Sequence, residues 1–138
     1  MATFKFELVS PATLLFSGEV EEVIVPGAEG EFTVLPGHAP LVSTLRPGFL
    51  RFKNGADNMA VFVRSGFAEI NETGLIVLAE EATRIEEINA AEFAASVSAF
   101  EAKIASEPSD QVRDKMTETL SQLKVVQAQL AGGASAAH

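Results

Sequence analysis

The chain has 138 residues, of which 47% are hydrophobic, enough for one modest domain or a domain with an appendage. Its net charge is −9, with 10 Lys and Arg against 19 Asp and Glu. This balance argues against nucleic-acid binding, which needs a basic face, and against direct docking on an anionic lipid surface. The sequence contains no Cys, which excludes disulfides, thiolate nucleophiles and zinc–thiolate sites.

The sequence also lacks the marks of membrane insertion. No hydrophobic run approaches the ~20 residues that a membrane-spanning helix needs. The segment Met1–Lys5 has no long apolar stretch of the kind found in signal peptides. We therefore expect a soluble, cytoplasmic protein that meets a membrane only through a protein partner.

Residues 4 to about 80 predict a series of short β-strands. Apolar residues alternate with others between Phe4 and Val9, the period of two that is typical of a strand. Turn signals such as Asn54-Gly55, Ser65-Gly66 and Glu72–Gly74 separate later runs. Short runs with turn signals every 8–12 residues or so are typical of an antiparallel sandwich or barrel. The remaining predicted strands lie at 19–25, 32–34, 41–45, 49–53, 59–64, 67–71 and 75–79.

Helical periodicity replaces the strand pattern near residue 85. Apolar residues recur at steps of three and four between Phe93 and Ile104, and again between Val112 and Leu130. The fold class is therefore predicted as α+β. We expect a β-sandwich domain over residues 1–84 and a C-terminal antiparallel helical hairpin over residues 85–138, with a frayed tail from Gly132 onward.

Capping signals mark the ends of the two predicted helices. Asn89 followed by Glu92 fits an N-cap, so the first helix is predicted to begin near Ala90. Pro108 marks a break, after which Ser109 or Asp110 can cap the second helix. A hairpin of ~40 residues buries little apolar area by itself. It is therefore expected to lean on the sheet domain or a partner, or to alternate between docked and open states.

The segment VPGAEGEFTVLPGHAP at residues 25–40 has two readings, a phosphate-binding loop or tight turns beside a strand. A phosphate-binding loop needs a Lys and a following helix. Here two acids stand at Glu29 and Glu31, and a β-prone run follows. The interpretation as tight turns is favoured over a phosphate-binding loop. Pro26-Gly27 and Pro36-Gly37 are each predicted to form a type II turn.

No catalytic, metal-binding or cofactor-binding residue stands out. His38 lies beside a predicted turn, His138 is terminal, and no serine nucleophile motif is present. Paired glutamates such as Glu80-Glu81 could serve a hydrolase, but the chain has no Trp or Tyr to form a sugar platform. Protein contact is the favoured function. Two alternatives remain open: a stand-alone ligand- or peptide-binding module with a helical dimerisation hairpin, and a small acid–base hydrolase.

The turn-rich segment also carries a family resemblance. The pattern VPGxxGxFTVLPGHAPL at 25–41, with LxPG at 45–48, closely resembles the epsilon subunit of bacterial F-type ATP synthase, whose mitochondrial equivalent is called delta. Four further segments fit: Phe6–Pro11, Phe16–Val20, Gly66–Glu69 and Val77–Ala82. The resemblance implies an antiparallel β-sandwich of about ten short strands followed by a helix pair.

The resemblance further implies a non-catalytic rotor subunit of the central stalk. Such a subunit links the gamma subunit to the c-ring and couples proton flow to ATP synthesis. It lies peripherally at the cytoplasmic face of a bacterial inner membrane. The helix pair folds against the sandwich or extends along gamma to the alpha and beta subunits, which it meets transiently and where it hinders ATP hydrolysis.

The resemblance also points to contact residues. The loop Ala28, Glu29, Gly30 and Glu31 is expected to meet the c-ring, because glycine lets the backbone approach and the acids can pair with polar loops. His38 and Pro40 are expected on a partner-facing surface.

Two departures from the family pattern lead to further expectations. Some members bind ATP through an Ile/Leu-Asp-x-x-Arg-Ala motif, but here Asn89 and Glu92 replace the Asp and the Arg, so ATP binding is not expected. In inhibitory members, basic residues of the second helix meet an acidic segment of beta. Here the basic residues of that helix are interleaved with Asp110, Asp114 and Glu118, so we expect weak inhibition. The basic residues concerned are Arg113, Lys115 and Lys124.

Overall fold

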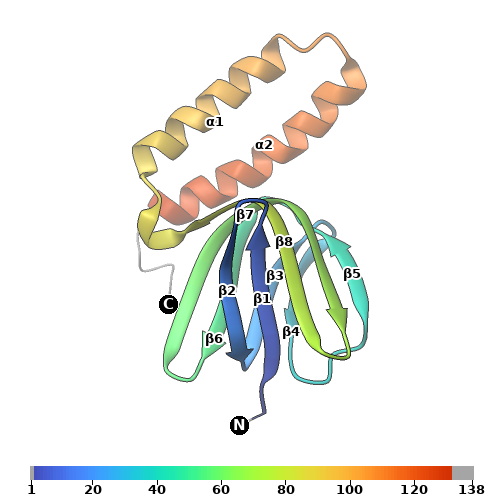
Figure 1. Cartoon of the computed structure of the whole chain (residues 1–138). Coiled ribbons are helices and arrows are strands. Elements are labelled where there is room, and N and C mark those ends of the chain that lie inside the picture. The colour runs from blue at the N-terminus through green and yellow to red at the C-terminus, as the bar shows by residue number, and fades with distance from the viewer. Residues whose placement is uncertain (1, 132–138) are drawn as a thin grey trace.

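The computed structural model describes residues 2–131 and shows a β-sheet body with a helical hairpin over one end (Figure 1). Met1, His138 and the predicted tail from Gly132 lie outside the described residues. The strands are β1 Phe4–Ser10, β2 Thr13–Val20, β3 Glu22–Gly27, β4 Gly30–Val34, β5 Leu41–Thr44, β6 Gly48–Asn54, β7 Asp57–Asn71 and β8 Gly74–Arg84. A 3₁₀ turn at Ile85–Glu87 leads into α1 Ala90–Ala105 and α2 Asp110–Ala131.

The strands form one sheet that folds over on itself. Its order is β2-β1-β8-β7-β6-β3-β4, and β5 pairs with β7. Strands β1 and β8 pair in parallel, whereas the other pairings are antiparallel. Phe16 of β2 and Phe52 of β6 are far apart in this order, yet their ring centroids lie 4.6 Å apart. The sheet therefore encloses a core between two layers, and the predicted α+β architecture is confirmed.

Several strand boundaries differ from the predicted ones, and the described residues form eight strands rather than about ten. The predicted break at Ser65-Gly66 is wrong, because β7 continues through it with φ of 64° and 120° at these residues. A Cβ at Gly66 would lie 1.9 Å from the Leu78 carbonyl oxygen, so this close approach requires glycine. Strand β2 was missed because it lacks a clear alternation of apolar and polar residues.

The first predicted Pro-Gly turn is wrong, and the second is confirmed. Pro26 and Gly27 lie inside β3, and the turn falls at Ala28 and Glu29 instead. Gly27 packs too closely for a side chain, since a Cβ there would lie 2.7 Å from the Gly30 carbonyl oxygen. At the second site, the His38 N–H donates to the Leu35 carbonyl at 3.1 Å. Gly37 supplies the positive φ, 83°, that such a turn requires.

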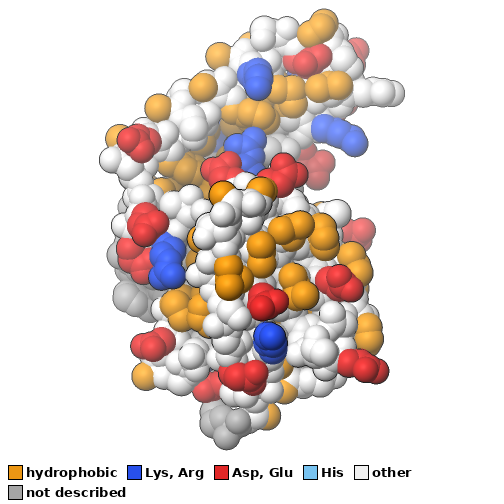
Figure 2. Space-filling model, in the orientation of Figure 1, with side chains coloured by type: hydrophobic (Ala, Val, Ile, Leu, Met, Phe, Trp, Pro, Cys, Tyr) orange, Lys and Arg blue, Asp and Glu red, His pale blue; other side chains and the backbone are white. Residues whose placement is uncertain are grey.

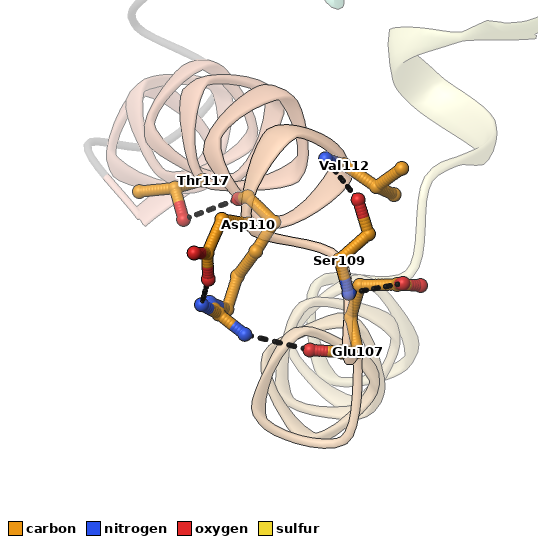
Figure 3. Close-up of polar contacts among 6 residues, drawn as sticks. Glu107, Ser109, Asp110, Val112 and Thr117 are labelled. Carbon is orange, nitrogen blue, oxygen red and sulfur yellow. Dashed lines mark hydrogen bonds and ion pairs between the residues drawn. The ribbon is translucent and has the colours of Figure 1, made fainter.

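Both helices begin at the predicted caps. The Asn89 side chain accepts a hydrogen bond from the Glu92 N–H at 3.0 Å. The Ser109 hydroxyl accepts one from the Val112 N–H at 3.3 Å (Figure 3). The Glu107 carboxylate in turn accepts from the Ser109 N–H at 3.0 Å. These bonds fix the connection between α1 and α2, which run antiparallel as predicted.

Two apolar clusters divide the interior. The larger cluster lies inside the sheet body and draws on seven strands and the Leu45 loop. Its most deeply buried large side chains are Phe6, Leu8, Leu50 and Leu75. The smaller cluster lies between the outer face of β6 and β7 and the two helices. It joins Phe49, Ala60 and Phe62 of the sheet to Val97, Leu123 and Val126 of the hairpin.

Candidate interaction surfaces

The smaller cluster fixes the position of the hairpin. The rings of Phe62 in β7 and Phe93 in α1 meet edge to face, with centroids 5.4 Å apart. The guanidinium of Arg64 lies 5.4 Å from the ring centroid of Phe100 in α1. The hairpin is thus docked on the sheet body in this structure, the first of the arrangements expected for it.

The predicted contact residues fall into two groups at different ends of the sheet body. Ala28 lies beside the hairpin, because it lines the same hollow as Phe100 and Glu118. Glu31 lines a second hollow there with Gln122 of α2. Ala28, Glu29 and Glu31 are exposed, Gly30 is half-buried, and no ion pair of these acids occurs within residues 2–131.

His38 and Pro40 belong to the other group. They line a hollow of 270 Å³ with Phe4 and the turn between β7 and β8, which includes Asn71 and Thr73. This hollow lies at the end where the N-terminus enters, opposite the hairpin (Figure 1). His38 is half-buried, and its Nδ1 donates to the Ala39 carbonyl at 2.7 Å. The structure therefore does not bring the six predicted residues together into one site.

An apolar surface that sequence reasoning missed covers the outer face of β5, β7, β8, β1 and β2. Figure 2 shows hydrophobic side chains gathered on the front of the sheet body, with acidic residues between them. Exposed fractions of 67% for Val42, 39% for Phe67, and 37% for both Ile76 and Leu78 are high for such residues. We call Leu14, Val42, Phe67, Ile76 and Leu78 the outer apolar face.

Strand register explains why these side chains share one face. Phe67 pairs with Leu78, and Glu69 pairs with both Ile76 and Val42. Alternate residues of the same strands, such as Ala68 and Val77, point into the core. Part of the signal was present in the sequence, because the run Leu75–Ala79 is apolar at both alternating sets of positions. Contiguous exposed apolar surface of this kind marks an interaction site.

The described residues offer no evident catalytic or metal site. Within residues 2–131, no group of three or more His, Asp or Glu is arranged to hold a metal ion. In the same range, no helix is long and apolar enough to cross a membrane. Asn89, at the position of the ATP motif, already uses its side-chain oxygen as a helix cap. A β-sandwich with an exposed apolar face and a docked helical hairpin is typical of a protein that acts by binding other proteins.

Comparison with known proteins identifies the class. Residues 3–85 match the family described as ATP synthase, Delta/Epsilon chain, beta-sandwich domain. The chain is 48% identical over 130 residues to the ATP synthase epsilon chain 1 of Nitrobacter hamburgensis and to the epsilon chain of a Bradyrhizobium strain. Each alignment covers 94% of this chain and 96% of the relative. The chain belongs to the family of ATP synthase epsilon chains, the non-catalytic central-stalk subunits of F-type ATP synthase.

Solved structures agree with this assignment. A chain in the Euglena gracilis mitochondrial ATP synthase structure, which contains OSCP, F1 and the c-ring, matches with a TM-score of 0.77 and 27% identity. The match covers 94% of this chain and 82% of that one. A chain of the Tetrahymena thermophila central stalk and c-ring has a TM-score of 0.69 at 8% identity, a likeness of fold alone. Similar proteins thus occur in assemblies of the central stalk and c-ring.

Proposed function

We propose that this chain links a gamma subunit to the c-ring and so couples proton flow to ATP synthesis. The observation that carries the proposal is the outer apolar face, which is exposed in a chain whose family works inside a rotor assembly. The c-ring is its connection to the membrane, at the cytoplasmic face of a bacterial inner membrane.

The outer apolar face is the proposed gamma-binding surface. Apolar side chains with acidic neighbours such as Glu69 and Glu7 suit a partner that offers apolar residues rimmed by basic ones. His38 and Pro40 extend this surface, because the chain runs from Pro40 directly into Leu41 and Val42 of β5. The purified chain is expected to form a one-to-one complex with gamma in size-exclusion chromatography. Failure to co-elute with gamma would contradict the assignment and favour the stand-alone module.

The loop Ala28–Glu31 is the proposed c-ring contact. Its separation from His38 and Pro40 supports separate partners for the two groups. Replacing Glu29 and Glu31 with Lys is expected to weaken assembly of the catalytic head on the ring and to lower ATP synthesis driven by a proton gradient. The double substitution Glu86→Lys and Glu87→Lys matches the charge change at two exposed residues outside both proposed contact surfaces. Equal coupling in both double variants would remove the assignment.

The hairpin at residues 85–138 is the proposed regulatory domain, and its hold on hydrolysis is proposed to be weak. Arg113 pairs with Asp110 and donates to the Glu107 carbonyl at 2.7 Å. Lys124 pairs with Glu101 of α1 at 3.0 Å. Two of the three basic residues are thus engaged within the hairpin, which leaves less positive charge for the beta subunit. A many-fold rise in hydrolysis by the whole enzyme after deletion of residues 85–138 would contradict weak inhibition.

A further inference from the structure

A polar hollow lies where the hairpin meets the sheet body. Its volume is 320 Å³, comparable to the smaller ligand pockets of proteins. It is bounded by the loop before β6, by β7, and by both helices. The lining residues that matter here are Arg46, Arg64, Ser65, Thr119 and Gln122.

Two arginines of this hollow lack an anionic partner. Arg46 and Arg64 are half-buried, and neither side chain makes an ion pair or hydrogen bond with any residue in 2–131. Arg64 is held over the ring of Phe100, which leaves the N–H edge of its guanidinium available. In a chain of net charge −9, two unpaired guanidinium groups beside one hollow are unusual.

The other polar groups of the hollow suit the same kind of ligand. Ser65 and Thr119 carry hydroxyl groups and Gln122 carries an amide, all of which can donate hydrogen bonds. Glu118 also lines the hollow, but it is exposed and pairs with neither arginine. The hollow therefore combines two cations and three neutral donors with a single carboxylate, which belongs to an exposed residue.

We propose that this hollow binds a phosphate-like oxyanion. The planar guanidinium donates two parallel hydrogen bonds to tetrahedral oxyanions, and such charge-assisted bonds are the stronger kind. The site is distinct from the motif position at Asn89, which lies at the start of α1. The inference does not depend on the partner assignments above.

Binding at this hollow stabilises the docked hairpin. Arg46 and Arg64 belong to the sheet body, whereas Thr119 and Gln122 belong to α2 and Phe100 to α1. An anion bound by residues of both the sheet body and the hairpin loses the donors of α2 when the hairpin undocks. By linkage, the anion therefore favours the docked state in proportion to its occupancy.

Titration of the full chain with inorganic phosphate tests the proposal. Chloride is exchanged for phosphate at constant ionic strength, and amide chemical shifts are followed by NMR. Saturable shifts centred on Arg46, Arg64 and Thr119 are expected. The Arg46→Gln variant is expected to bind about tenfold more weakly, because it loses a charge-assisted contact. Arg84→Gln removes an exposed arginine outside the hollow, and is expected to leave the affinity unchanged.

General salt effects are separated from binding at the hollow by saturation of the shifts and by one further variant. Phosphate stabilises many proteins without a site, but that effect does not saturate and is equal in all variants. Arg46→Lys keeps the charge and loses the paired hydrogen bonds, so it is expected to fall between wild type and Arg46→Gln. Non-saturating shifts, or equal affinity in wild type, Arg46→Gln and Arg46→Lys, would overturn the proposal.

Discussion

The sheet body and the hairpin differ in how they are held together. The sheet body has its own enclosed core, with Phe6, Leu8 and Leu50 fully buried among residues of other strands. Up to Ala131, where the described part of the chain ends, the hairpin has three buried residues, and their cluster is completed by Phe49, Ala60 and Phe62 of the sheet. A helix pair of this size is marginal in isolation. The hairpin therefore depends on the sheet body, whereas no described residue of the hairpin belongs to the body's main core.

The largest effect on the unfolding of the whole chain is expected from damage to the main core. Phe6→Ala removes a ring whose centroid lies 5.0 Å from that of Phe52 and 5.6 Å from that of Phe16. The free energy of unfolding is expected to fall by about 3–5 kcal/mol, the usual loss for a buried Phe. Denaturant unfolding followed by circular dichroism measures it. A loss below about 1 kcal/mol would show that the main core is not the source of the body's stability.

Damage to the smaller cluster is expected to undock the hairpin and to leave the sheet body folded. Leu123→Asp places a carboxylate where the side chain is 3% exposed, at a cost above the ~2–5 kcal/mol of a Leu to Ala change. Hydrogen exchange is expected to rise along α1 and α2 and to stay unchanged in β1 and β8. Val125→Asp is the matched control, because this residue is 59% exposed on the same helix. It is expected to leave hydrogen exchange unchanged in both the helices and the strands. Loss of protection in the strands as well would contradict the independence of the body.

A smaller effect is expected at the start of the hairpin. Asn89→Ala removes the bond from the Glu92 N–H to the cap, at a cost of about 1 kcal/mol. Exchange in the first turn of α1 is expected to rise most, with little change in α2. Asn89→Ser, which keeps a capping oxygen, is expected to restore most of the protection. If Ser behaved like Ala, the cap would have no role in holding the helix.

Much of the fold could be predicted because its signals are local. The caps at Asn89 and Ser109, the break at Pro108 and the turn at Gly37 depend on neighbouring residues. The misplaced boundaries depend on distant ones. Gly66 is required by the Leu78 backbone on β8, which no local pattern reveals.

The interaction surfaces were harder to predict than the fold, for a physical reason. Ala28 and His38 are only ten positions apart in the chain, yet they line different hollows of the sheet body. The extended β4 strand carries the chain from one end of the body to the other between them. The outer apolar face arises from residues of four strands, and only the register of β5, β7 and β8 brings Val42, Phe67 and Ile76 side by side.

The affinity of the chain for a gamma subunit, measured for two variants and one control variant, tests the central claim most directly. Ile76→Glu changes the outer apolar face, Leu123→Asp undocks the hairpin, and Thr33→Glu is an exposed control on β4. Calorimetry is predicted to show binding at least about tenfold weaker for Ile76→Glu, since a desolvated charge opposes an apolar contact. Leu123→Asp and Thr33→Glu are predicted to bind like the wild type. Wild-type affinity for Ile76→Glu together with lost binding for Leu123→Asp would contradict the account, because gamma would then be held by the hairpin.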